Sequence, residues 1–143
     1  MMKASGTDSA LELTLYGKPV AVLDHAELGF TVDGQAYIVQ HSGFFGLLYE
    51  LQRDGLTLVS AKQSPFLLQF TVTLGERAWM LKMLSFTHQK RFGLFDGDTQ
   101  VGSIMPSSRM HYTRDIAIDL PEELPLAGQV FLMWLLLWKW SDD

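Results

Sequence analysis

The feature of this chain that most constrains its fold is an apolar run near the C-terminus. Residues 126–140 read Leu-Ala-Gly-Gln-Val-Phe-Leu-Met-Trp-Leu-Leu-Leu-Trp-Lys-Trp, and a helix of this sequence is apolar on every face. Such a helix must be surrounded by protein or by lipid. Spanning a bilayer takes about 20 apolar residues, but here Gln129 interrupts the run and Lys139 ends it. We therefore expect a buried core helix at about 125–140 and no transmembrane span.

The chain before this helix has the pattern of short strands separated by glycine turns. Four glycines recur at intervals of 20 to 22 residues, and three of them follow an aspartate. Asp-Gly between apolar runs is a strong hairpin signal, because both residues tolerate positive φ. Apolar and polar residues also alternate, as in Leu11–Tyr16, which is typical of strands with one buried face. Hairpin turns are expected at Gly34, Gly55, Gly75 and Gly97.

These signals predict an all-β fold with one helix, a closed antiparallel β-barrel of about eleven or twelve strands that encloses the C-terminal α-helix. The small and polar residues 1–9 are expected to be a flexible tail, and residues 10–143 a single domain. In the predicted strand 66–73, Phe66 shares a face with Phe70. The eleven candidate strands are 10–16, 19–23, 27–32, 35–40, 46–52, 56–61, 66–73, 77–84, 91–95, 100–104 and 110–120.

Composition narrows the classes of partner and the location. Hydrophobic residues make up 48% of the 143 residues, which favours a well-filled interior. The formal net charge of −5 argues against duplex nucleic acid as a partner. The absence of cysteine excludes disulfides and thiolate metal ligands. No apolar segment of the secretory type precedes Leu11, so a cytoplasmic location is expected.

Three stretches give the chain a family resemblance. They are the repeated phrase in residues 45–55 and 92–104, the last strand from Tyr112, and the apolar helix. In these the chain resembles the tubby C-terminal-like superfamily, and within it the LURP-one-related branch. The resemblance implies a closed barrel around a hydrophobic helix. It also implies a binding or membrane-associated role, since tubby proteins bind phosphoinositides and scramblases act on phospholipids.

No motif for catalysis, a cofactor or a metal stands out. Asp96-Gly97-Asp98 lacks the distal glutamate of a calcium loop, so we interpret it as a hairpin turn. Gly102-Ser103 lies in a strand pattern rather than in the strand-to-helix elbow of a serine hydrolase. The histidines lack the spacing of a helical metal pair and are interpreted as structural. They are His25, His41, His88 and His111.

One basic group is the best candidate contact surface. Lys82, His88, Lys90 and Arg91 are close in sequence, and phenylalanines flank them. Cations beside exposed aromatic rings suit anionic phospholipid headgroups, although a solvated hairpin end has the same composition. The two phenylalanines of 42–46 are expected to plug one end of the barrel.

The sequence thus predicts a non-enzymatic binding domain, either peripheral to a membrane or held to a protein partner. Two alternatives remain open. An enzyme would assemble its site from scattered histidine and aspartate residues, and a carrier of a small apolar ligand would need space beside the helix.

Overall fold

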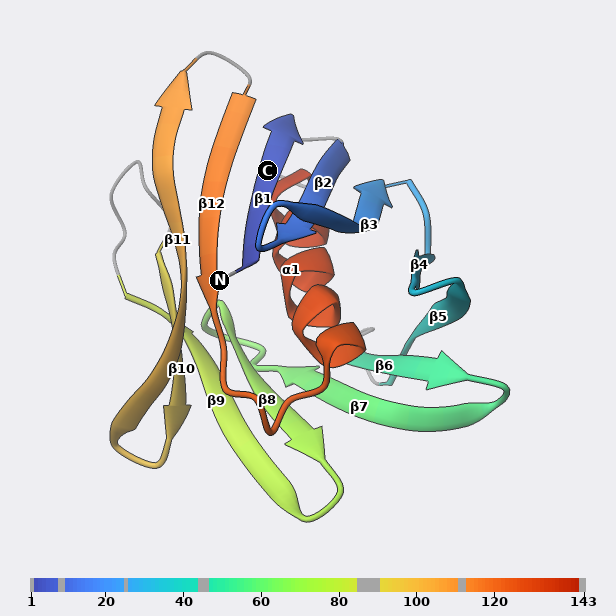
Figure 1. Cartoon of the computed structure of the whole chain (residues 1–143). Coiled ribbons are helices and arrows are strands. Elements are labelled where there is room, and N and C mark those ends of the chain that lie inside the picture. The colour runs from blue at the N-terminus through green and yellow to red at the C-terminus, as the bar shows by residue number, and fades with distance from the viewer. Residues whose placement is uncertain are drawn as a thin grey trace.

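The computed structural model describes residues 2–7, 10–24, 26–43, 47–84, 91–110 and 113–141. These residues form twelve strands and one helix (Figure 1). The elements are β1 (Met2–Thr7), β2 (Ala10–Leu15), β3 (Lys18–Asp24), β4 (Gly29–Val32), β5 (Gln35–Ser42), β6 (Leu48–Arg53), β7 (Leu56–Gln63), β8 (Gln69–Leu74), β9 (Arg77–Met83), β10 (Phe92–Asp96), β11 (Thr99–Met110), β12 (Thr113–Asp119) and α1 (Leu126–Ser141).

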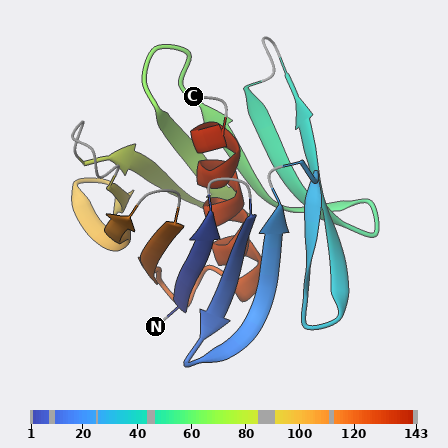
Figure 2. The ribbon, with the colours of Figure 1, turned by 90° about the horizontal axis from the view of Figure 1, so that it is seen from above.

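All twelve strands belong to one antiparallel sheet that curls around α1 into a nearly closed barrel (Figure 2). The strand order is β3-β2-β1-β12-β11-β10-β9-β8-β7-β6-β5-β4. Each pair of neighbours in the sheet is therefore also consecutive in the chain, except for β1 and β12. The predicted fold class is therefore confirmed. The barrel is not sealed, however, because β3 and β4 are the two edges of the sheet and form no ladder with each other among the described residues.

The predicted hairpin turns are present. Asp33-Gly34 and Asp54-Gly55 connect their strands with positive φ at both residues, 52° and 75° in the first turn and 53° and 79° in the second. These are the dihedrals that match the right-handed twist of paired strands. Gly75 and Gly97 also have positive φ, 58° and 62°, and lie between β8 and β9 and between β10 and β11.

The flexible N-terminal tail is a wrong prediction. Residues 2–7 form β1, which pairs with β2 on one side and with β12 on the other. Met2 and Ala4 are 2% and 1% exposed, so their side chains belong to the core. The segment looks polar because small and charged residues occupy its outward positions. Its ladder partners in β12 come from the far end of the chain, so local sequence does not reveal the pairing.

Two strand boundaries also differ from the sequence prediction. Residues 110–120 were expected to be one strand, but β11 continues to Met110 and β12 begins at Thr113. The β11–β12 register shifts between Pro106 and Ser108. An irregularity of this kind accommodates a proline, which has no N–H for the ladder, inside a long strand.

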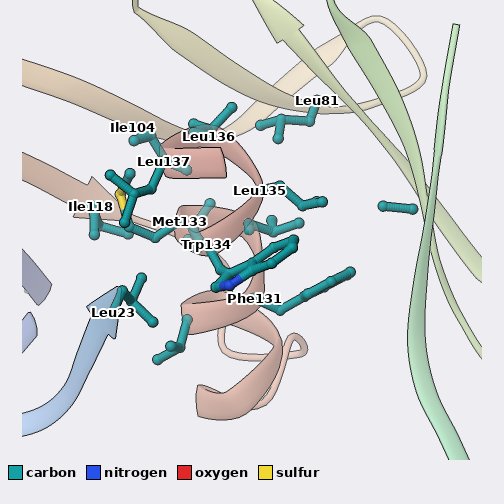
Figure 3. Close-up of a cluster of buried hydrophobic side chains, with 14 of the residues drawn as sticks. Leu23, Leu81, Ile104, Ile118, Phe131, Met133, Trp134, Leu135, Leu136 and Leu137 are labelled. Atoms are coloured by element: carbon teal, nitrogen blue, oxygen red, sulfur yellow. The ribbon is translucent and has the colours of Figure 1, made fainter. Parts of the chain in front are cut away.

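Helix α1 fills the barrel, as predicted from its sequence (Figure 3). Every residue from Val130 to Leu137 is at most 1% exposed, so no face of this segment meets solvent. Gln129, the one polar residue in the apolar run, donates from Nε2 to the carbonyl of Leu124 at 2.9 Å. At Gly128 the helix comes close to β7, where an added Cβ would lie 3.3 Å from Val59 Cγ2.

The antiparallel meander places successive connections at alternate ends of the barrel. We call one end the turn end, which holds the turns at 16–17, 33–34, 54–55, 75–76 and 97–98. The opposite end, the loop end, holds the connections that follow β1, β3, β5, β7, β9 and β11. Because α1 follows β12, it runs from the turn end toward the loop end.

Candidate functional site

Two of the predicted contact residues lie at the loop end, Lys82 near the end of β9 and Arg91 immediately before β10. Lys82 is opposite Gly93 in the β9–β10 ladder, and Leu84 N–H donates to the Arg91 carbonyl at 2.6 Å just beyond it. Residues directly opposite in a ladder point to the same face, so Lys82, Leu84 and Arg91 share the outer face. His88 and Lys90 lie outside the described residues.

The Lys82 side chain packs over an aromatic ring of the next strand. Its Nζ is 5.1 Å from the centroid of the Phe95 ring, a cation–π distance. The contact holds the ammonium group on the outer surface rather than beside the core. Lys82 is half-buried, whereas Arg91 is exposed.

The connection between β7 and β8 adds an apolar tip that the sequence did not predict. Phe66 is 91% exposed and Leu67 58% exposed, although residues 66–73 were expected to be a strand with Phe66 on its buried face. Strand β8 begins only at Gln69. Ser64 N–H donates to the Gln69 carbonyl at 2.9 Å and closes the connection.

Local chemistry explains why the strand starts late. Proline at position 65 has no N–H for a ladder, and Ser64 Oγ accepts the Phe66 N–H at 3.5 Å. A serine hydroxyl that bonds to a nearby backbone N–H favours a turn over a strand. Ser64-Pro65 is therefore the signal that sequence reasoning missed.

The ladder brings this tip beside the basic residues. Lys82 is opposite Gln69, the first residue after the connection. Lys62, exposed at the end of β7, precedes the connection on its other side. We call this group the loop-end patch: Lys62, Phe66, Leu67, Lys82, Leu84 and Arg91.

Formal charge is distributed unevenly between the two ends. The turn end and the β12–α1 connection hold eight carboxylates against three cations, a net charge of −5, which equals the net charge of the whole chain. Arg77 is one of those cations and is ion-paired with Asp96 at 3.3 Å and Glu123 at 3.0 Å. The carboxylates are Asp33, Asp54, Glu76, Asp96, Asp98, Asp119, Glu122 and Glu123, and the cations Lys18, Arg53 and Arg77. The rest of the chain is neutral overall, so the turn end is the acidic pole.

The other candidate residues are dispersed. His41 is on β5 and stacks on Tyr49 with 4.4 Å between ring centroids, while His25 and His111 lie outside the described residues. Asp96-Gly97-Asp98 forms the β10–β11 turn, and Gly102-Ser103 is within β11, as expected. Phe44 and Phe45, the expected plugs, are not in the described part of the chain. In that part, no three His, Cys, Asp or Glu side chains group closely enough to hold a metal ion.

Three hollows among the described residues lie at the margins of the barrel. One of about 460 Å³ is next to the start of α1 and one of about 440 Å³ is between β1, β12 and the helix start. A third, of about 750 Å³, follows the seam between β3 and β4. Helix side chains occupy the space where a barrel of this kind would hold a ligand.

Comparison of the chain with protein-family models, with curated proteins and with solved structures gives no match. Among the residues described, no helix combines the length and the apolar character needed to cross a bilayer.

Proposed function

We propose that this protein is a non-catalytic binding domain that docks peripherally on anionic phospholipid through its loop-end patch. The observation that carries the proposal is the exposure of Phe66, 91%, at the tip of a connection flanked by Lys62 and Lys82. An exposed aromatic ring beside cations combines apolar insertion with attraction to headgroups. The proposal includes the tubby-like, LURP-one-related identity suggested by the sequence resemblance, and a cytoplasmic location.

The charge distribution supports this orientation. The acidic turn end is repelled by an anionic surface, and the opposite end carries the patch. The electric field of this charge distribution would orient the molecule, with its loop end toward the membrane, before contact. The negatively charged cytoplasmic leaflet has the surface potential to produce this effect.

The expected affinity is modest. Inserting Phe66 and Leu67 partway would contribute about 3 kcal/mol, half of the usual value for full burial of two such side chains. Three cations near the surface would add about 1 kcal/mol each. A total of about 6 kcal/mol corresponds to a dissociation constant between 1 mM and 1 μM.

The test is co-sedimentation with vesicles of phosphatidylcholine, with and without phosphatidylserine, at low and high salt. We expect binding only to the anionic vesicles, and weaker binding at high salt, because screening reduces surface attraction. Phe66→Ser/Leu67→Ser and Lys82→Glu/Arg91→Glu should each reduce binding about tenfold or more. The matched controls are Leu56→Ser, a 69% exposed leucine beside the β6–β7 turn, and Lys18→Glu, also at the turn end.

Two results would reject the patch. One is equal binding by the wild type and both double variants, and the other is a comparable loss in the Leu56 control. If no vesicle binds the protein at all, lipid docking is wrong and a protein partner becomes the better function.

A further inference from the structure

The seam of the barrel has two strand edges that pair with no other described strand. Strands β3 and β4 are consecutive in the chain, and each pairs on one side only, with β2 and with β5. Figure 2 shows the two strands separating as they leave their short connection at the loop end. A strand edge offers a row of backbone donors and acceptors to an incoming chain.

The edge of β4 is the open one. In the β4–β5 ladder, Val32 and Phe30 face Gln35 and Tyr37, and the Val39 N–H donates to the Leu28 carbonyl at 3.0 Å. Because hydrogen-bonded pairs alternate along an antiparallel ladder, the backbone groups of residues 29 and 31 point into the seam.

The edge of β3, in contrast to that of β4, is protected against pairing with another strand. Lys18 and Pro19 begin this strand, and the β2–β3 register shifts opposite them, between Leu13 and Thr14. Lysine, proline and a bulge are the features that block pairing at natural edges. Strand β4, Gly29–Val32, has none of the three.

The outer surface of the seam is an apolar groove. It has a volume of about 750 Å³, and three of its lining side chains are large, apolar and mostly solvent-exposed. They are Val22, Leu28 and Ile38, which are 64%, 50% and 57% exposed. Among the described residues that line it, Asp24 and Glu27 are the only charged ones, and both lie at the loop end of the groove.

The central helix fixes the geometry of this groove. Trp134 Nε1 donates to the Glu27 carbonyl at 3.0 Å, and the Asp24 carboxylate and carbonyl accept the N–H groups of Ala26 and Glu27. The connection is thus fastened to the core and directs two carboxylates to one end of the seam. A preformed site avoids the ordering cost of binding.

We propose that the seam captures an extended segment of a partner protein by strand addition to β4. The segment carries alternating β-branched side chains, which cover Val22 and Ile38, and a lysine or arginine next to Asp24 and Glu27. Backbone hydrogen bonds provide affinity and the alternate side chains provide specificity in this mode of recognition. Charge complementarity at the acidic end sets the direction of the segment.

Charge also makes a second copy of the chain a poorer occupant of the seam than a basic segment. Antiparallel pairing of two β4 strands would bring Asp24 and Glu27 of each copy toward Asp33 of the other, since the two groups lie at opposite ends of β4. Like charges brought together in this way oppose association. Only a segment with a basic end complements the groove.

The experiment measures fluorescence anisotropy of labelled, end-blocked peptides with the full chain and no vesicles. The probe is Arg-Val-Thr-Val-Thr-Val, compared with a version that has Glu in place of Arg and with one N-methylated at alternate residues. We expect the Arg peptide to bind about tenfold more tightly than the Glu peptide, and the methylated peptide not to bind. Glu27→Lys, which leaves the backbone bond to Trp134 available, should reverse the preference. Hydrogen exchange should slow at the amides of Gly29 and Thr31.

Ile38→Lys should abolish binding, whereas Leu56→Lys, at an exposed leucine outside the groove, should leave it unchanged. Circular dichroism of both variants is the check that they are folded. Three outcomes would overturn the proposal. The first is that no peptide binds at about 1 mM, a peptide concentration at which even weak strand addition is measurable. The others are that Glu27→Lys leaves the preference for the Arg peptide over the Glu peptide unchanged, or that sedimentation shows a dimer that Ile38→Lys dissociates.

Discussion

Replacing Trp134 tests whether the helix is the core of this fold and whether it anchors the seam. The side chain is 1% exposed, stacks on Trp138 with 5.2 Å between ring centroids, and meets Tyr49 edge-on at 6.3 Å. Truncation of a large aromatic side chain in a core costs about 3–5 kcal/mol. We expect Trp134→Ala to reduce the free energy of unfolding by this amount. For a chain of this length the melting temperature should fall by roughly 3 °C for each kcal/mol.

The hydrogen bond from Trp134 can be separated from the burial of its ring. Trp134→Phe keeps an aromatic ring but removes the donor, so the Glu27 carbonyl loses its 3.0 Å partner. An acceptor left unpaired costs about 1–3 kcal/mol. Trp79 provides the matched control, because it is 2% exposed and its Nε1 has no hydrogen-bond partner within the described part of the chain.

Trp79→Phe therefore loses ring area but no hydrogen bond. The assay is chemical denaturation followed by far-UV circular dichroism, since the substitutions alter the fluorescence signal itself. We expect Trp134→Phe to be the more destabilising of the two by at least about 1 kcal/mol. An equal loss in both variants would refute the role of the hydrogen bond. A loss below about 1 kcal/mol for Trp134→Ala would refute the central position of the helix.

Three further predictions concern the helix, the first strand and a turn. Deleting residues 126–143 should abolish cooperative thermal unfolding, because the helix fills the barrel; a cooperative melt of the truncated chain would contradict this. Ala4→Asp should lower the free energy of unfolding in denaturant by more than about 3 kcal/mol, since it buries a charge in β1. The control Lys3→Asp, on the exposed face of β1, should change it by less than about 0.5 kcal/mol. Similar values for the two variants would mean that β1 is not docked on the core. Gly34→Ala should cost about 1–2 kcal/mol from positive φ alone, because no atom of the described residues lies within 4 Å of the added Cβ. A neutral effect would exclude the left-handed turn.

The helix and the turns were predictable because their causes are local. A segment that is apolar on every face has to be enclosed, and this holds whatever surrounds Val130–Leu137. Asp33-Gly34 and Asp54-Gly55 adopt positive φ because of their own side chains, or the lack of one. The alternation of apolar and polar residues then predicted an antiparallel sheet, and this prediction required no information on long-range contacts.

The N-terminal strand and the candidate site depended on tertiary structure. Met2 and Ala4 are buried because β12 and β2 lie on either side of β1. A short polar segment carries no local signal that predicts these partners. Sequence placed Lys82 and Arg91 together, but only the β8–β9 register brings Lys82 next to the connection that exposes Phe66. In sequence, Phe66 continues an alternating pattern identical in kind to that of buried Phe70.

The open seam is the clearest case of a feature that tertiary structure alone decides. Whether β3 pairs with β4 depends on how tightly twelve strands curl around one helix, and the Trp134 hydrogen bond to the Glu27 carbonyl holds their connection in place. Closure of a barrel is a property of the whole sheet, set by the tilt and stagger of all its strands. The sequence by itself determined the parts, a buried helix and a set of hairpins. The tertiary structure decided which edges remain open, because edge pairing is a long-range contact that no local pattern encodes.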